Sequence, residues 1–212
     1  MNLVRLFEIQ DGLNFHIKKE RGLLDRDLIE EDILGLQVKI GELADRQRTW
    51  KYWTEDQKPY DEVYTCIDKD MNIIYLPQHP TYADKVTTTL KVESFLLDSF
   101  VSAISFLINI SLQLGIKAED FNLNCKFDQK PIAKQFNNLF AYTNVIYAFL
   151  DDEAPFSISR EDMSEAVSDL FTELYEMKIM KFGFSDEDVE GCYLEKNEQM
   201  HEKLNYVKGE II

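Results

Sequence analysis

The segment "LQVKIGELADRQRTWKYW", residues 36–53, combines acidic and basic side chains at helical spacing. Lys39, Glu42 and Asp45 follow one another at intervals of three residues, which places them close together on one helical face. Two carboxylates one turn apart are suited to share a divalent cation, whereas an ammonium group one turn earlier is not. This face therefore predicts metal chemistry with a lysine at the place where a third oxygen ligand would be useful.

Length and composition restrict the classes of protein to which the chain can belong. With 212 residues and 45% hydrophobic content, it can bury a full core as a single domain over residues 1–212. The net charge of −16 argues against nucleic-acid binding, which needs a basic surface, so we expect no nucleic-acid partner. A triphosphate ligand would need a local basic pocket or bridging cations to offset this charge.

No targeting or membrane segment is expected. The opening "MNLVRLFEIQDGLNF" lacks the basic region and the uninterrupted apolar run of a signal peptide. No stretch reaches the roughly 18 apolar residues that a membrane span needs, because polar residues interrupt even "FLLDSFVSAISFLINISLQLGI". Three cysteines that form no C-x-x-C suit a reducing compartment. We therefore expect a cytoplasmic protein without a membrane partner.

Helical periodicity dominates the chain, and capping and breaking residues divide it into six expected helices. We expect them at about 3–17, 25–48, 91–114, 131–150, 159–182 and 185–206. The "RG" at residues 21–22 breaks the first helix, and Ser159 and Asp162 have the spacing of a capping box at the start of the fifth. The third is apolar nearly all round and should be central. The core candidates of the second are Leu28, Leu34, Val38 and Leu43. Apolar runs on either side of "DKDMN" predict a small β-hairpin in an insertion at about 57–88.

Four pieces of the sequence together resemble one family, the all-α dimeric dUTPases of the MazG-like nucleoside-triphosphate pyrophosphatases. "LFEIQDGLNFHI" is similar to the family's first helix, and "GLQVKIGELADRQRTWKYW" to its metal helix with the K-x-W corner that follows. "VSAISFLINISLQLGI" resembles the second metal helix, and "FGFSDEDVEGCYLEKNEQMHEKLNYV" the C-terminal signature. The resemblance implies an all-α helical bundle of the dimeric dUTPase type, here with a small inserted β-hairpin, that forms a homodimer.

The resemblance also implies a metal site, and this sequence departs from it. In the family, an E-x-x-E on one helix and an E-x-x-D on the next bind magnesium ions, which activate water to cleave dUTP into dUMP and pyrophosphate. The E-x-x-E falls on Lys39 and Glu42, and the E-x-x-D falls on Ser99 and Ser102. Only Glu42 remains of four expected ligands, so no catalytic set is intact. Asp45 and Asp98 lie near the expected metal face as possible substitutes.

The nucleotide side of the family pattern is better preserved. Gln10 and Asn14 resemble polar residues near the family's nucleoside pocket, although they could equally be exposed on the first helix. In the C-terminal signature Met200 and Leu204 stand for an asparagine and a glutamine. The residues that the resemblance assigns to nucleotide binding are Gln10, Asn14, Lys51, Trp53, Lys196, Asn197, His201 and Lys203. The lysines could also be ordinary surface charges, and the tryptophan could serve in packing.

These observations leave three functions open. The first is a dUTPase-like homologue that has lost or weakened its hydrolysis and binds a dUTP- or dUMP-like nucleotide or a protein. It needs no cofactor, apart from magnesium if a residual site survives. The second is an active dUTP or NTP pyrophosphatase with a rearranged acidic site of Glu42, Asp45 and Asp98. The third is an acidic protein that mimics nucleic acid. For the first, Glu42 is expected on a cleft wall facing Ser99 and Ser102, within reach of Lys39.

Overall fold

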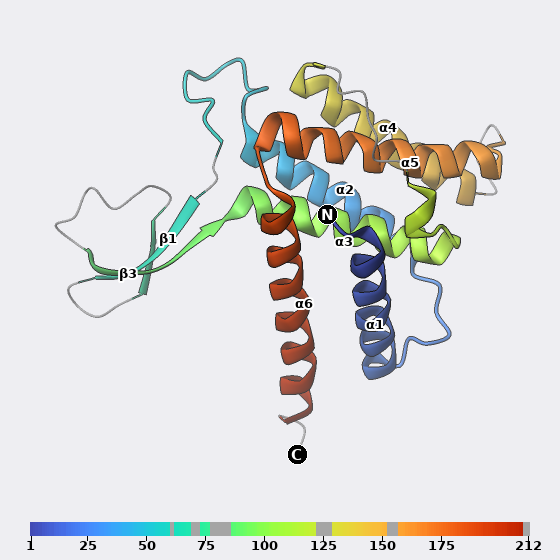
Figure 1. Ribbon diagram of the computed structural model, residues 1–212, viewed down its shortest axis with the longest axis horizontal. Helices are drawn as coiled ribbons and strands as arrows, with labels where there is room; N and C mark the ends of the chain where they lie inside the picture. The colour runs from blue at the N-terminus through green and yellow to red at the C-terminus, as the bar shows by residue number, and fades with distance from the viewer. Residues whose placement is uncertain (60–61, 69–72, 77–85, 122–128, 152–156, 210–212) are drawn as a thin grey trace.

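The computed structural model describes residues 1–59, 62–68, 73–76, 86–121, 129–151 and 157–209. The predicted helical bundle is confirmed, and a small sheet stands to one side of it (Figure 1). The α-helices of this part of the chain are α1 (Leu3–Arg21), α2 (Ile29–Gln47), α3 (Phe95–Leu114), α4 (Ile132–Leu150), α5 (Arg160–Met177) and α6 (Asp186–Gly209). A 3₁₀ turn follows α3 at Ala118–Asp120, and a π turn follows α5 at Lys178–Phe182.

Local capping explains several helix ends. Gly22 takes a left-handed conformation with φ 66° after α1, so the predicted break at "RG" ends the first helix at this glycine. The hydroxyl of Ser159 accepts from Asp162 N while the carboxylate of Asp162 accepts from Ser159 N, so the predicted capping box begins α5. These ends follow from residues within one turn of one another.

Helix α3 forms the centre of the bundle, as its composition predicts. Phe100, Ile104 and Leu107 are fully buried along it. It packs closely on α2. The ring of Phe106 on α3 lies so near Gly35 on α2 that a Cβ added at this glycine would be only 2.4 Å from the ring. Among the described residues, α3 is also the one helix long and apolar enough to cross a membrane by length and composition. Its burial inside the bundle is typical of the core helix of a soluble protein.

Helix α2 turns a different face to the core from the one predicted. Leu34 and Val38 are 61% and 50% exposed, so their assignment to the core is wrong. The face that packs on the bundle carries Ile29, Ile33, Leu36, Ile40 and Leu43. Both sets of apolar residues recur at helical spacing, so only packing against α3 and α4 decides which set is buried.

The inserted region is larger than the predicted hairpin. It forms a three-stranded antiparallel sheet in the order β2-β1-β3, made of β1 (Glu62–Asp68), β2 (Ile73–Leu76) and β3 (Val86–Ser94). Tyr64 of β1 is opposite Leu76 of β2 and Val92 of β3. The third helix therefore begins at Phe95 rather than near residue 91, because β3 continues to Ser94, which caps α3. The remainder of the predicted insertion, including residues 77–85, lies outside the described residues.

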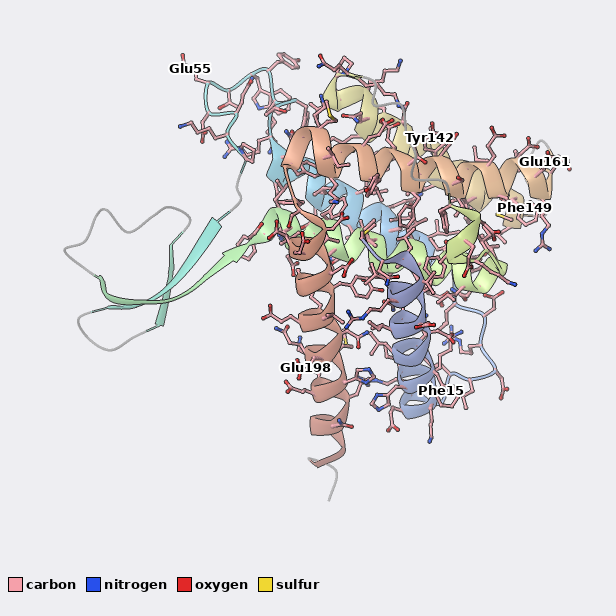
Figure 2. The ribbon with its side chains drawn as sticks, viewed as in Figure 1. Phe15, Glu55, Tyr142, Phe149, Glu161 and Glu198 are labelled. Carbon is pink, nitrogen blue, oxygen red and sulfur yellow. The ribbon has the colours of Figure 1, made fainter. Side chains whose placement is uncertain are left out.

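Helices α1 and α6 run side by side away from the rest of the bundle (Figure 1). Their contacts include the hydroxyl of Tyr193 with Gln10 near the bundle and the rings of His16 and His201 further out. Figure 2 shows Phe15 near the free end of α1, where its ring is 60% exposed. The two helices thus form the walls of a space that α2 and α3 close from the other side.

Candidate functional site

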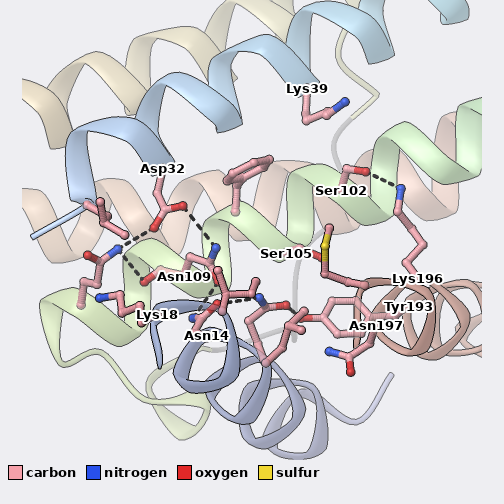
Figure 3. A pocket seen from close by; sticks show the side chains of 17 residues that line it. Asn14, Lys18, Asp32, Lys39, Ser102, Ser105, Asn109, Tyr193, Lys196 and Asn197 are labelled. Carbon is pink, nitrogen blue, oxygen red and sulfur yellow. Dashed lines mark hydrogen bonds between the residues drawn. The ribbon is translucent and has the colours of Figure 1, made fainter. Parts of the chain in front are cut away.

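A pocket of about 470 Å³ lies between α1, α2, α3 and α6. Its middle is apolar, with side chains that include Leu13, Phe106 and Met200. Figure 3 shows polar groups at both ends, with Asp32 and Lys18 at one end and Ser102 and Lys196 at the other. A ligand that fits this pocket would combine an apolar or aromatic body with hydrogen-bonding groups.

A chain of side-chain hydrogen bonds lines one side of the pocket. The hydroxyl of Tyr193 contacts Gln10 Oε1, and burial raises the pKa of this hydroxyl, so it stays protonated. Gln10 Nε2 donates to Asn14 Oδ1 at 3.0 Å, and Asn14 Nδ2 donates to Asn109 Oδ1 at 3.0 Å. Gln10 is only 4% exposed, and a buried amide needs hydrogen-bond partners in place of water. Its bonds to Tyr193 and Asn14 supply them. The chain fixes the orientation of the amides that a ligand would meet.

Asp32 of α2 ends this chain of hydrogen bonds. Its two carboxylate oxygens accept from Asn109 Nδ2 at 3.2 Å and from Gln113 Nε2 at 2.6 Å. Burial raises the pKa of Asp32, and the hydrogen bonds from the two amides and the charge of Lys18 act in the opposite direction. The carboxylate is therefore held mainly by neutral amides rather than by a cation.

Lys39 and Glu42 pair with each other on α2. Lys39 Nζ lies 2.9 Å from Glu42 Oε2 and 3.1 Å from Oε1, so the lysine engages both oxygens of the one retained acid. The sequence spacing predicted this contact. Both side chains are about one-third exposed. Lys39 lines the pocket, whereas Glu42 is not part of the pocket wall as described.

The two serines of α3 differ in their surroundings. Lys196 Nζ lies 2.6 Å from Ser102 Oγ and 2.6 Å from Asp98 Oδ1, so α6 brings an ammonium group to this place. Ser99 is fully buried and is absent from the described pocket wall, and its hydroxyl has no hydrogen-bond partner among the described residues. The expectation that both serines face a cleft therefore holds for Ser102 and is wrong for Ser99, because α3 turns Ser99 into the core.

Each of the three carboxylates considered for a metal site has a lysine as its partner. Besides the pairs of Glu42 and Asp98, Asp45 Oδ1 lies 2.5 Å from Lys51 Nζ, on an exposed corner that does not line the pocket. Magnesium prefers several charged oxygens in octahedral array, and an ammonium group beside each oxygen opposes it. No group of three or more His, Cys, Asp or Glu within the described ranges is placed to hold a metal ion. These residues do not fit the two-metal centre that the family resemblance implies.

Four of the eight residues assigned to nucleotide binding come together in the pocket. Gln10 and Asn14 reach it from α1, and Lys196 and Asn197 reach it from α6. The amide Nδ2 of Asn197 is buried without a hydrogen-bond partner among the described residues. An unpaired buried donor of this kind costs about 1–3 kcal/mol, so an acceptor from a ligand would stabilise it.

The other four residues lie elsewhere. Trp53 is 62% exposed and packs edge-on against Trp50, and its neighbour Lys51 pairs with Asp45 outside the pocket. His201 stacks on His16 with ring centroids 4.8 Å apart, and Lys203 is exposed on α6. The path of the chain after α2 carries the aromatic corner away from the pocket, which sequence order alone does not reveal.

Sequence reasoning overlooked several residues of the pocket. Asp32, Asn109 and Gln113 make its hydrogen-bonded end, and Tyr193 joins α6 to α1. A signal for two of them was present, because Asn109 and Gln113 are amides one turn apart on a helix that is otherwise strongly apolar. Such a pair in a core helix indicates a buried polar partner.

Comparison with known families gives a match over the first part of the chain. Residues 2–65 match the model of the family described as dUTPase. Over these residues the chain is similar to the all-α dUTPases. The matched part contains α1 and α2, and with them Gln10, Asn14, Lys39 and Glu42. Helices α3 and α6 lie beyond the match. No curated protein matches the chain.

Proposed function

We propose that this dUTPase relative has lost magnesium-dependent pyrophosphohydrolysis and binds a nucleotide-type ligand in the pocket between α1, α2, α3 and α6. The observation that carries the proposal is the contact of Lys39 Nζ with both carboxylate oxygens of Glu42, at 2.9 and 3.1 Å. The ammonium group engages both oxygens of the one acid that the family pattern retains, so these oxygens are already neutralised by a cation. The odd number of widely spaced cysteines further supports a cytoplasmic protein.

The loss of ligands is large enough to remove the reaction. In two-metal hydrolysis each metal supplies on the order of several kcal/mol of transition-state stabilisation, and about 1.4 kcal/mol corresponds to a factor of ten in rate. Ser102 offers a neutral hydroxyl that already contacts Lys196, and Ser99 is buried in the core. Positioning by lysines alone does not replace stabilisation of this size.

The binding half of the proposal rests on the pocket wall. Gln10 and Asn14 belong to a hydrogen-bonded chain that fixes their amides, and Asn197 holds a buried amide donor without a partner among the described residues. The apolar middle of the pocket suits the face of a planar ring. Together these groups favour a ligand with a base-like ring and polar edges.

A hydrolysis assay tests the proposal. The purified protein is incubated with dUTP and with the other deoxynucleoside triphosphates, with magnesium or with EDTA, and release of pyrophosphate is measured. We expect no release above the buffer rate in any arm. Isothermal titration calorimetry with the corresponding nucleosides and nucleotides is expected to detect binding of at least one of them. Robust magnesium-dependent turnover would contradict the proposal and point to a rearranged site of Glu42, Asp45 and Asp98.

The homodimer that the family resemblance implies remains part of the proposal. The apolar surface of α3 is used inside one chain, so it does not itself argue for a partner. Leu34 and Val38 instead expose an apolar strip on α2. A dimer in light scattering at micromolar concentration, with dissociation by Leu34→Glu, would support this assignment. A monomer at every concentration would refute it.

A further inference from the structure

The end of the pocket near α6 contains two lysines that already have carboxylate partners. Lys39 Nζ lies 2.9 Å from Glu42 Oε2, and Lys196 Nζ lies 2.6 Å from Asp98 Oδ1. Both lysines line the pocket, as Ser102 does, whereas the two acids are not part of the pocket wall as described. The positive charges that line this end of the pocket are thus balanced by acids that do not line it.

The charge at this end sums to zero before any ligand enters. Two ammonium groups are offset by two carboxylates. At the opposite end the charge of Lys18 acts to lower the pKa of Asp32, against the effect of burial. A phosphate monoester carries about −1.5 to −2 charges at neutral pH, and a triphosphate carries more. In a chain with a net charge of −16, both lysines that this added charge would meet at the α6 end of the pocket already have a carboxylate partner.

We infer that the pocket selects an uncharged nucleoside over its phosphorylated forms, and that Glu42 and Asp98 determine this specificity. The inference rests on the proposed function, because it assumes that the ligand is of the nucleotide type. Each acid holds a pocket lysine in an ion pair. A phosphate must therefore either share the lysine with the acid, against the repulsion between the two negative groups, or displace the acid. An uncharged ligand does not meet this cost.

The rest of the pocket suits such a ligand. Its volume of about 470 Å³ is within the range of small-molecule sites. Phe106 and Leu13 offer apolar surface in the middle, and Asn197 offers a buried amide donor for a ring carbonyl. Because these contacts involve only neutral groups, their strength does not depend on magnesium.

Calorimetric titration of the wild-type protein tests the selectivity. The probes are deoxyuridine, dUMP and dUTP, each with magnesium and with EDTA. We expect deoxyuridine to bind at least about tenfold more tightly than dUMP or dUTP, since a charged group that loses its partner is penalised by an amount of this order. Magnesium is expected to leave the order unchanged.

Two substitutions sharpen the test, because the inference predicts that each of them strengthens the binding of dUMP. Asp98→Asn releases Lys196, and Glu42→Gln releases Lys39, so each variant is expected to bind dUMP about tenfold more tightly, as for a new charge-assisted hydrogen bond. The affinity for deoxyuridine should stay within about twofold. Asp45→Asn is the matched control. It changes the net charge equally and also breaks a lysine pair, but that pair lies on an exposed corner away from the pocket, so dUMP affinity should not change.

The outcomes separate the inference from the proposed function. If dUMP or dUTP binds wild-type protein as tightly as deoxyuridine, the selectivity is refuted while nucleotide binding stands. If Asp98→Asn and Glu42→Gln keep the wild-type melting temperature but gain no dUMP affinity, the specificity role of the two acids is refuted. If no probe binds the wild-type protein, the proposed function fails and the inference fails with it.

Discussion

Helices α2 and α5 each carry charged residues at the i, i+3 spacing of a metal-binding helix, and they use them in different ways. On α5, Glu173 and Glu176 are 2% and 4% exposed. On α2 the corresponding positions are Lys39 and Glu42, which are each about one-third exposed. The two acids of α5 share one cation from outside the helix, whereas the acid of α2 has its cation one turn away on the same helix.

The surroundings of the two pairs explain the difference. Lys130 Nζ lies 2.9 Å from Glu173 Oε2 and 3.5 Å from Glu176 Oε2, and Asn138 Nδ2 adds a bond to Glu173 at 3.2 Å. Burial favours the neutral form of Lys130, yet its contacts with the two acids raise its pKa. An E-x-x-E is therefore no metal site by its spacing alone. Which cation balances the carboxylates depends on what packs against the helix.

The largest expected effect breaks the α5 side of this comparison. Lys130→Met leaves two buried carboxylates without their shared cation, so the free energy of unfolding should fall by about 3–5 kcal/mol. Urea denaturation followed by circular dichroism measures the change. Lys134→Met is the matched control, because this lysine is exposed in the first turn of α4, four residues further along the chain, and its effect should stay within about 0.5 kcal/mol. Equal effects of the two substitutions would mean that the α5 pair does not depend on Lys130.

The next effect converts the α2–α3 face into an acidic one. The triple variant Lys39→Glu, Ser99→Glu and Ser102→Asp restores the family's ligand pattern. It should be less stable than wild type in EDTA, because Ser99 is fully buried and a carboxylate there lacks a cation. Magnesium at a hundredfold above its dissociation constant should then restore about 2.7 kcal/mol of stability.

Thermal unfolding with magnesium and with EDTA measures the magnesium effect on the triple variant. Wild-type protein and the three single variants serve as controls and should show no magnesium-dependent shift, because a partial ligand set holds magnesium poorly. A wild-type shift as large as that of the triple variant would refute the idea that these positions decide metal binding.

A smaller effect is expected when the α2 pair itself is broken. Lys39→Met removes the cation from a carboxylate that is about one-third exposed and that water can still solvate, so the loss of stability should not exceed about 1 kcal/mol. A double-mutant cycle with Glu42→Gln should give a coupling energy of about 0.2–1 kcal/mol. A coupling energy between Lys39 and Glu42 that exceeds the coupling energy between Lys130 and Glu173 would reverse the comparison.

The smallest expected effect concerns Asp32, the carboxylate that neutral amides hold. Its pKa in the folded protein is raised above the ordinary value of 3.8, so between these two values the folded state binds more protons than the unfolded state. Stability contributed by this group therefore falls as pH rises through that window. Asp32→Asn should remove this part of the pH dependence. Urea midpoints measured across the acidic range for both proteins would show parallel curves if Asp32 does not contribute.

Much of the fold was predictable, and the core face of α2 shows why part of it was not. The ends at Gly22 and Ser159 and the central place of α3 are as predicted. The core face of α2 was wrong, since Leu34 and Val38 recur at helical spacing like the residues that are actually buried. Periodicity identifies a helix, but it does not say which of two apolar strips meets a neighbour.

The sequence by itself determined the features that arise within one or two turns of chain. The contact of Lys39 with Glu42 is one of these, because helical geometry brings residues three apart together wherever the helix lies. The tertiary structure alone decided the contact of Lys196 with Asp98, which are 98 residues apart, and the hydrogen bonds that hold Asp32 against α3. It also placed Trp53 outside the pocket. Such contacts depend on how α6 and α3 pack, and no spacing along the chain encodes that packing.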